Sequence, residues 1–475
     1  MEFDKDLKAR QEARLLLRQA EQAQKELARY SQEKLDAIAK GICDAVDAAS
    51  PELAELAVRE TGFGNVEDKI TKNRFASKRV WEAIRDMKTV GVLKEAPREK
   101  LWEIGVPVGV IAAIVPSTNP TSTVCYKAMI ALKAGCSIVF SPHPKALACT
   151  LRAAQIVKAA AERSGAPAGS VACLTIPSMD GCKELMSGEQ TRLILATGGP
   201  AMVRSAYSSG KPAIGVGAGN GPAYIHHSAD VGQALEMIAR SKTFDYGTVC
   251  ASEQSIVVEK SLEDQVRREG IKRGFYFMNT AEAGELAKLL FKPNGTLNPQ
   301  IVGKSALILA QMAGFSVPQD TRVLVAREQE AGPTRPYSME KLCPVLAFFV
   351  MDSEDAVLQK AIEVLTHEGT GHTFAIHAQD VDVIRKFALQ IPVSRFLVNT
   401  PAALGGIGAT TGLFPALTLG CGAAGGSSSS NNISPMDLIN IRRVAWGQEA
   451  APAAAPTVNE DLVELLTRKI LEKLG

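Results

Sequence analysis

The sequence predicts an α/β protein in which a parallel sheet is covered by helices on both faces. Short apolar segments alternate with helical segments from Gly109 to Ile225, and a second α/β alternation runs from Asp230 to about Val398. Apolar residues make up 46% of the 475 positions and charged residues 22%, an ordinary composition for a globular protein with large cores. A chain of this length corresponds to about three domains of ~150 residues.

The N-terminal part precedes this alternation and is expected to be helical. Ala, Leu, Glu, Gln, Lys and Arg dominate residues 4–48, Pro51 is expected to end that helix, and a further helical stretch follows to about Met87. Leu101–Val110 is rich in β-formers but contains Pro107, which favours an edge strand or a ribbon.

The two alternations supply the expected strands and helices in chain order. Helices are expected over 123–134 and 147–164 in the first, and over 231–241, 262–273 and 353–365 in the second. Parallel sheets bind ligands at the carboxyl ends of their strands. The expected strands are Val110–Val115, Ser137–Ser141, Val171–Ile176, Leu193–Ala196, Ala223–Ile225, Ser255–Val258, Val345–Val350, Thr373–Ile376 and, after a glycine-rich run, Leu438–Val444.

Charge and hydropathy exclude several classes of protein. The 53 Lys and Arg residues nearly balance 51 Asp and Glu residues, and a net charge of +2 gives no basic field for nucleic acid or anionic lipid. The longest nearly apolar run, 106–116, is shorter than the ~18–20 residues that span a bilayer. The first ten residues lack the apolar segment of a secretory signal, so we expect a cytoplasmic protein with no membrane or nucleic-acid partner.

The C-terminal residues have a different composition from the rest. Residues 450–458 form a Pro/Ala spacer, after which Asn459 is expected to cap a helix over Glu460–Leu474. Val463, Leu466 and Ile470 belong to an apolar stripe on this helix. The helix either folds back on the body or pairs in an oligomer, or it docks to another protein.

The nine cysteines are isolated, with no CxxC pair, and we expect reduced thiols. His367, His372 and His377 are spaced by five, whereas helical metal ligands are usually spaced by four, so no metal site is expected. Cys250, in FDYGTVCASEQS, follows a helix on a glycine-containing turn. Backbone N–H groups at such a turn favour the thiolate, although most cysteines are simply small buried apolar residues.

Seven ordered segments resemble one known family: VPSTNPTST (115–123), FSPHPKA (140–146), ATGGPAMVRSAYSSGKPAIGVGAGN (196–220), FDYGTVCASEQ (244–254), EKLCPVLA (340–347), GTGHT (369–373) and NTPAALGGIG (399–408). Residues 1–447 resemble the CoA-acylating branch of the aldehyde dehydrogenases. The similarity is greatest to the propionaldehyde and acetaldehyde dehydrogenases of bacterial microcompartments and to the aldehyde half of bifunctional aldehyde/alcohol dehydrogenases. The resemblance implies a Rossmann-type NAD(H)- and CoA-binding domain (1–96 and 109–229), a catalytic α/β domain (230–431), an oligomerisation β ribbon (97–108 and 436–447), a linker (450–458) and a C-terminal amphipathic helix similar to encapsulation peptides (459–475).

The resemblance also implies roles for single residues. Cys250 is the expected nucleophile, which adds to an aldehyde and becomes a thioester after hydride transfer. Asn119 is the expected oxyanion donor, although ungapped counting places Thr118 at that position. His372 is expected to accept the proton of the CoA thiol because histidine titrates near the working pH, with His367 a weaker candidate and a structural role for His372 the alternative.

For the cofactor, the resemblance implies that Glu340 binds the nicotinamide ribose; the alternative is a solvated glutamate. Family members often carry Lys-Pro-x-Glu at the adenosine end, where this chain reads His143-Pro144-Lys145-Ala146. Losing that glutamate removes the usual acceptor for the 2′-hydroxyl, which leaves NADP open beside the expected NAD. The other expected cofactor contacts are Ser117, Thr118, Thr197, Gly198, Gly199 and Gly217, with Thr197–Gly199 as a backbone nest for pyrophosphate.

Hydrolytic members carry a glutamate before the catalytic cysteine, where it activates water; here counting back from Pro222 places Val216 at that position. The expected reaction is therefore oxidation of propionaldehyde or acetaldehyde by NAD⁺ with acyl transfer to CoA, and a hydrolytic NAD(P)-dependent dehydrogenase is the alternative. The resemblance further implies a homodimer or homotetramer. It also implies cargo inside a bacterial microcompartment, bound to shell proteins through 459–475.

Overall fold

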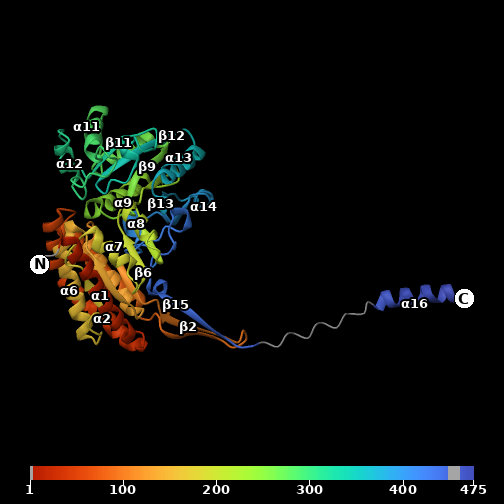
Figure 1. Ribbon diagram of the computed structural model, residues 1–475. Coiled ribbons are helices and arrows are strands. Elements are labelled where there is room, and N and C mark those ends of the chain that lie inside the picture. Colours follow the sequence, from red (N-terminus) through yellow and green to blue (C-terminus); the bar gives the residue numbers. More distant parts are fainter. Residues whose placement is uncertain (1–3, 448–459) are drawn as a thin grey trace.

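The computed structural model describes residues 4–447 and 460–475, so the predicted spacer at 450–458 and Asn459 lie outside the described residues. Two α/β lobes form the body, and a narrow ribbon extends away from it (Figure 1). The N-terminal lobe holds a five-stranded sheet and the second lobe a seven-stranded sheet, both with parallel strands. The predicted α/β class is confirmed.

The first sheet has the strand order β5-β4-β3-β6-β7. Ile111 and Ala113 of β3 pack with α2, α5 and α6, whereas Ala112 packs on the other face with α1 and α7. This period-two alternation gives a sheet that is buried on both sides. The elements are α1 (Lys5–Leu27), α2 (Gln32–Thr61), β3 (Val110–Ile114), α5 (Pro120–Lys133), β4 (Ser137–Ser141), η2 (Pro144–Ala146), α6 (Leu147–Arg163), β5 (Val171–Cys173), α7 (Met179–Ser187), β6 (Thr191–Thr197), α8 (Pro200–Tyr207) and β7 (Ala213–Val216).

The N-terminal helices differ from the prediction. The predicted helix over 4–48 is interrupted between α1 and α2, and α2 continues through Pro51, which was expected to end it. Burial of Leu53 and Ala57 beyond the proline offsets the lost backbone hydrogen bond. After α2 come α3 (Val66–Arg74), a π-helical turn η1 (Phe75–Arg79) and α4 (Val80–Ile84).

The second sheet has the order β10-β11-β12-β9-β8-β13-β14. It includes β8, whereas the predicted domain boundary between residues 229 and 230 assigns this strand to the first lobe. The chain changes sheet before β8 instead. Short apolar strands look alike in both sheets, so the sequence alone does not separate them. The elements are β8 (Gly221–Ile225), α9 (Val231–Thr243), η3 (Phe244–Gly247), β9 (Glu253–Glu259), η4 (Lys260–Leu262), α10 (Glu263–Ile271), β10 (Phe275–Phe277), α11 (Thr280–Leu290), α12 (Ala306–Met312), β11 (Val323–Arg327), η5 (Pro336–Ser338), β12 (Val345–Met351), α13 (Glu354–His367), β13 (Gly371–His377), α14 (Val381–Ala388), β14 (Val393–Val398), α15 (Ala402–Gly406), η6 (Ala423–Gly425) and η7 (Pro435–Leu438).

The ribbon is a three-stranded antiparallel sheet of β1 (Gly91–Ala96), β2 (Leu101–Pro107) and β15 (Ile439–Ala445). It begins before residue 97, the predicted boundary, because β1 pairs with β2. The alternative of an edge strand at 101–110 is wrong, since β2 is central. Pro107 is tolerated there because it is the last residue of the strand.

The C-terminal helix α16 (Glu460–Leu474) was predicted with the same bounds. Every residue from 461 to 475 is exposed, and the helix lies away from the body (Figure 1). Across the described ranges, no helix combines the length and the apolar character needed to cross a bilayer.

Candidate active site

Cys250 lies on the loop between α9 and β9, in the second lobe, and is partly exposed. Asp245 and Tyr246 in this loop both have φ +49°, a left-handed conformation that is unfavourable for residues other than glycine. Lys69 and Lys72 of α3 hold the loop through ion pairs of 2.9 and 2.5 Å from their Nζ atoms to Asp245 Oδ2. The cysteine loop of one lobe is therefore anchored by a helix of the other.

Asn119 comes from the first lobe and reaches the same loop. Its Oδ1 accepts a 2.6 Å hydrogen bond from Lys72 Nζ, and its Nδ2 donates to the carbonyl of Thr248 at 3.2 Å, two residues before Cys250. The Thr118 hydroxyl accepts a further bond from Asn119 Nδ2 at 3.2 Å. The amide that faces the cysteine loop thus belongs to Asn119, while Ser117 and Thr118 complete the turn before α5.

The thiol of Cys250 does not have the lowered pKa expected from its turn. Burial raises its pKa to about 12, the carboxyl of Glu340 and the thiol of Cys421 raise it further, and the Arg395 guanidinium opposes them. Desolvation disfavours the thiolate, and the backbone N–H of Cys250 is a smaller opposing influence. The resting enzyme therefore holds a protonated nucleophile.

His372 is the second residue of β13 and lies, like Cys250, next to Gly219. A β-carbon placed on Gly219 would overlap the carbonyl oxygen of Cys250 and lie 3.1 Å from Cε1 of His372. The His372 Nδ1 lies 2.9 Å from the Thr373 hydroxyl, and its buried Nε2 has no hydrogen-bond partner among the described residues. Burial, assisted by Arg395, lowers the pKa of His372 to about 3, so the expectation of a histidine titrating near neutral pH is wrong and the imidazole is neutral.

Glu340 faces the same glycine. Its Oε1 accepts a 2.9 Å hydrogen bond from the Gly219 N–H, and its own N–H donates to Glu368. Burial, with repulsion from Glu368, raises the pKa of Glu340 to about 8. At neutral pH this carboxyl is therefore largely protonated and already engaged with the backbone beside Cys250.

The expected pyrophosphate nest lies at the carboxyl end of the first sheet. Thr197 ends β6, and Gly198 and Gly199 lead into α8, as predicted. Within residues 4–447 and 460–475, Thr197 Oγ1 is buried without a hydrogen-bond partner, and a β-carbon on Gly199 or Gly217 would meet no atom within 4 Å. A hydroxyl with an unused hydrogen bond, next to glycines that leave room for a ligand, suits a nucleotide phosphate. These residues could therefore hold the dinucleotide.

Residues 6–274, which include Asn119 and Cys250, match a sequence model described as "Aldehyde dehydrogenase family". This stretch is more than half of the chain. The chain belongs to the aldehyde dehydrogenase family. The resemblance inferred from seven segments is thereby confirmed.

Three relatives place this aldehyde dehydrogenase among known proteins. A solved acetylating aldehyde dehydrogenase from Geobacillus thermoglucosidasius is 48% identical, with a TM-score of 0.92 over 95% of this chain and 99% of that one. A solved propionaldehyde dehydrogenase from the fucose utilisation bacterial microcompartment of Clostridium phytofermentans is 28% identical, with a TM-score of 0.82 over 92% and 98%. The bifunctional aldehyde-alcohol dehydrogenase of Escherichia coli is 44% identical over 91% of this chain and 49% of that protein. The chain thus spans about half the length of the first curated relatives it matches.

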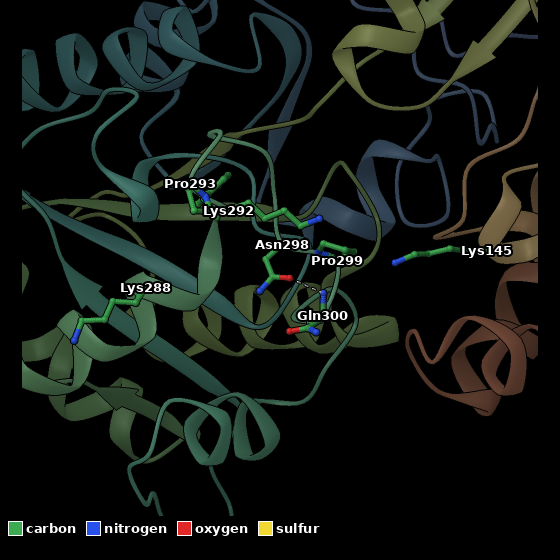
Figure 2. A pocket seen from close by; sticks show the side chains of 8 residues that line it. Lys145, Lys288, Lys292, Pro293, Asn298, Pro299 and Gln300 are labelled. Atoms are coloured by element: carbon green, nitrogen blue, oxygen red, sulfur yellow. Dashed lines mark hydrogen bonds between the residues drawn. The ribbon is translucent and has the colours of Figure 1, made fainter. Parts of the chain in front are cut away.

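The turn predicted to contact the adenosine lines, through Lys145, a basic pocket of about 410 Å³. His143 and Pro144 lie at the exposed turn after β4, where His143 Nδ1 accepts the N–H of Lys145 at 3.1 Å. Lys145 and Lys292 extend toward one another from the two sides of the pocket (Figure 2). In the described part of the chain neither makes an ion pair, whereas Lys288, which also lines the pocket, pairs with a neighbouring glutamate.

Arg395 is a site residue that the sequence reasoning missed. It is buried in β14 and donates long hydrogen bonds of 3.4 Å to Asn432 Oδ1 and the Gly371 carbonyl. Its Nε has no hydrogen-bond partner in the part of the chain that the structure describes. No carboxylate within the described ranges forms an ion pair with it, although its charge lowers the pKa of both Cys250 and Cys421. A single arginine in the apolar strand VSRFLV is the signal that could have found it.

One group of potential metal ligands does not include His367, His372 or His377, although the backbone N–H of His226 donates to the His377 carbonyl at 3.0 Å. In the described chain the potential ligand atoms of His226, His227 and Glu259 lie within 4.8 Å of one another. Ser228 Oγ accepts the N–H groups of residues 379 and 380, so its own proton points to His226 Nδ1 at 2.8 Å. The remaining proton of a neutral His226 is then on Nε2, which removes that lone pair from metal binding.

Proposed function

We propose that this aldehyde dehydrogenase oxidises a short aldehyde, propionaldehyde or acetaldehyde, with NAD⁺ and transfers the acyl group to CoA. The observation that carries the proposal is that Val216, and not a water-activating carboxylate, stands at the end of β7. Val216 is buried in the same apolar cluster as Val249 and Ala251, the two residues that flank Cys250 in the sequence. The similarity to an acetylating relative supports the same reaction.

The residues divide the reaction into two halves. The Cys250 sulfur adds to the aldehyde carbon to give a thiohemiacetal. The Cys250 N–H and the Asn119 Nδ2, with one N–H turned away from the Thr118 hydroxyl, stabilise its oxyanion. The nicotinamide cofactor supplies the hydride acceptor when it is bound. Loss of hydride and the hydroxyl proton leaves an acyl thioester on Cys250. The CoA sulfur then attacks the acyl carbon, the Cys250 sulfur leaves and recovers a proton, and acyl-CoA is released.

Two groups near Cys250 bear on the choice between CoA and water. Below pH 8 the carboxyl of Glu340 is mostly protonated and bonded to Gly219, which makes it a poor base for water. The neutral His372, with its free Nε2, can accept the proton of the CoA thiol, though its low pKa makes it a weak base. Both features favour a better nucleophile than water, so CoA is the proposed acceptor.

The deciding experiment is NADH production from propionaldehyde with and without CoA. Because general-base assistance contributes about 10²–10⁴-fold, we expect the rate without CoA to be lower by about 10²-fold or more. Equal rates would favour a hydrolytic dehydrogenase. The same assay with acetaldehyde and with NADP⁺ defines the preferred aldehyde and cofactor.

We further propose that the basic pocket binds the 3′-phosphate on the adenosine ribose of CoA. Lys145 and Lys292 line it and form no ion pair with any residue that the structure describes, and Lys145 is in the turn expected to contact the adenosine end.

The pocket proposal predicts how the enzyme distinguishes CoA from dephospho-CoA, which lacks that phosphate. Replacing both Lys145 and Lys292 with alanine is expected to raise KM for CoA about tenfold, because each exposed charge contributes up to about 1 kcal/mol. KM for dephospho-CoA should change little. Lys288→Ala is the matched control, since that ammonium is already paired with Glu285 at 2.6 Å. Equal increases in KM for both thiols would contradict the proposal.

A homodimer or homotetramer remains our proposal for assembly. The ribbon leaves the outer edges of β1 and β15 unpaired and exposes Trp102, Trp446 and Ile441. Unpaired edges and exposed aromatic rings favour pairing with another chain. Light scattering of the wild type and a Trp446→Ser variant tests this, since an unchanged mass would exclude this face.

We also propose that α16 binds microcompartment shell proteins, which would place the enzyme inside such a compartment. The exposed stripe includes Leu466, Ile470 and Leu474, and one solved relative comes from a microcompartment. Deleting residues 451–475 should abolish co-sedimentation with shell proteins and leave turnover intact. Loss of turnover would make the helix part of the catalytic fold.

A further inference from the structure

We propose that Lys72 is a positioning residue for the oxyanion donor: it fixes the amide of Asn119 and the Cys250 loop in one arrangement. The inference rests on the proposed function, because it assigns a role within that reaction. Lys72 is in α3, far from Asn119 and Cys250 in sequence, and nothing in its helical segment marks it as a site residue.

All three N–H bonds of the Lys72 ammonium are used. Nζ donates to Asn119 Oδ1 at 2.6 Å, to Asp245 Oδ2 at 2.5 Å and to the Thr248 hydroxyl at 2.9 Å, and the side chain is only 3% exposed. Three acceptors from two segments thus meet on one buried cation. An ammonium in this arrangement has no remaining hydrogen bond for solvent.

This arrangement decides which way the Asn119 amide faces. An ammonium can only donate, so the oxygen of the amide must face Lys72 and the NH₂ group must face the opposite side. On that side lies the Thr248 carbonyl, within the Cys250 loop. A rotated amide would place NH₂ against NH₃⁺ and leave the oxygen beside the reacting carbonyl, where it would repel the developing oxyanion.

The same cation holds the loop that carries the nucleophile. Asp245, at φ +49°, is kept in a strained conformation by Lys69, Lys72 and the Thr248 hydroxyl, which donates to its Oδ2 at 2.7 Å. Lys72 therefore links the two parts of the oxyanion site, the Asn119 side chain and the backbone near Cys250. A shift of either part would misplace donors that must lie about 3 Å from the oxyanion.

Lys69 provides a matched comparison within the same cluster. Its Nζ donates to Asp245 Oδ2 at 2.9 Å and to the Thr118 carbonyl at 3.1 Å, and no bond to the Asn119 side chain is among its contacts in the described structure. Replacing Lys69 removes the same charge from the same carboxylate. It leaves the hydrogen bond to the Asn119 amide in place.

The test is a double-mutant cycle between Lys72→Met and Asn119→Ala. We expect Asn119→Ala to lower kcat by about 10²-fold and Lys72→Met by at least about 10-fold, with KM for the aldehyde nearly unchanged. Because Lys72 acts partly through Asn119 and partly through the Asp245 loop, Lys72→Met should cost clearly less in the Asn119→Ala background than in the wild type, and the remaining loss should match that of Lys69→Met. In the matched cycle, the losses from Lys69→Met and Asn119→Ala should multiply.

Multiplying losses in the Lys72 cycle would overturn the inference and leave Lys72 a purely structural residue. Lys72→Gln, which retains an N–H donor without the charge, should recover part of kcat. Should Lys72→Met not fold, as judged by its circular dichroism spectrum and Tm, Lys72→Gln takes its place in the cycle with the same criterion. A wild-type enzyme that makes NADH equally fast without CoA would refute the proposed acyl transfer, while the cycle would still report on the oxidation step.

Discussion

Replacing Cys250 with alanine is expected to abolish acyl-CoA formation, lowering kcat by about 10⁴-fold or more. Without the sulfur there is no thiohemiacetal, and removing a nucleophile costs nearly as much as removing all of the groups that act with it. The measurement is NADH production from propionaldehyde with NAD⁺ and CoA. Mass spectrometry of the wild type with aldehyde and NAD⁺ but no CoA should show an acyl adduct on the peptide that contains Cys250.

The control for this prediction is Cys421→Ala, because Cys421 is the thiol that influences the pKa of Cys250. The adduct should remain on Cys250 in that variant. An adduct on another cysteine, or appreciable turnover by Cys250→Ala, would contradict the assignment.

The pKa of Cys250 gives the nucleophile a specific pH dependence. The thiol is protonated below its pKa of about 12, so alkylation by iodoacetamide in the free enzyme should accelerate with rising pH up to about pH 12. Glu340 loses its proton above about pH 8, and its negative charge then opposes formation of the thiolate. A plateau in the alkylation rate near neutral pH would show that the thiolate is already formed in the resting enzyme.

The sequence predicted where the site residues lie along the chain better than it predicted their protonation states. Cys250, Asn119 and Thr197 lie at turns that short motifs and element boundaries identify, and the structure brings Asn119 to the Cys250 loop. The pKa values of Cys250 and His372 depend instead on how completely other segments bury them. No spacing in the sequence encodes that burial.

Residues that support the site were missed for a related reason. Lys69 and Lys72 occur in the segment VEDKITKNR, which reads as an ordinary solvated helix. They are buried because the Asp245 loop and the turn that carries Asn119 both fold onto α3. Strand β8 was assigned to the wrong sheet because its apolar residues fit either one. Long-range packing decides both cases, whereas local patterns report only helix or strand.

Replacing Gly219 with alanine is the second change with a large expected effect, a loss of about 10²-fold in kcat. The added β-carbon would overlap the Cys250 carbonyl and contact His372 at 3.1 Å, so the buried backbone of the nucleophile loop must shift. A displacement of about 1 Å at the reacting atoms costs on this order. The readouts are kcat and the rate at which iodoacetamide alkylates Cys250.

Gly217→Ala, two residues earlier in the same segment, separates this steric effect from a general cost of replacing glycine. A β-carbon at Gly217 meets no atom within 4 Å, so the Cys250 loop should keep its position and alkylation should proceed at the wild-type rate. Any loss of activity in that variant should appear as a higher KM for the cofactor, because Gly217 is an expected cofactor contact. Equal losses of kcat in the two variants would mean that the Gly219 contact with Cys250 does not set the geometry of the nucleophile. A loss confined to Gly219→Ala would show that close packing of this glycine against the Cys250 carbonyl fixes the position from which the sulfur attacks.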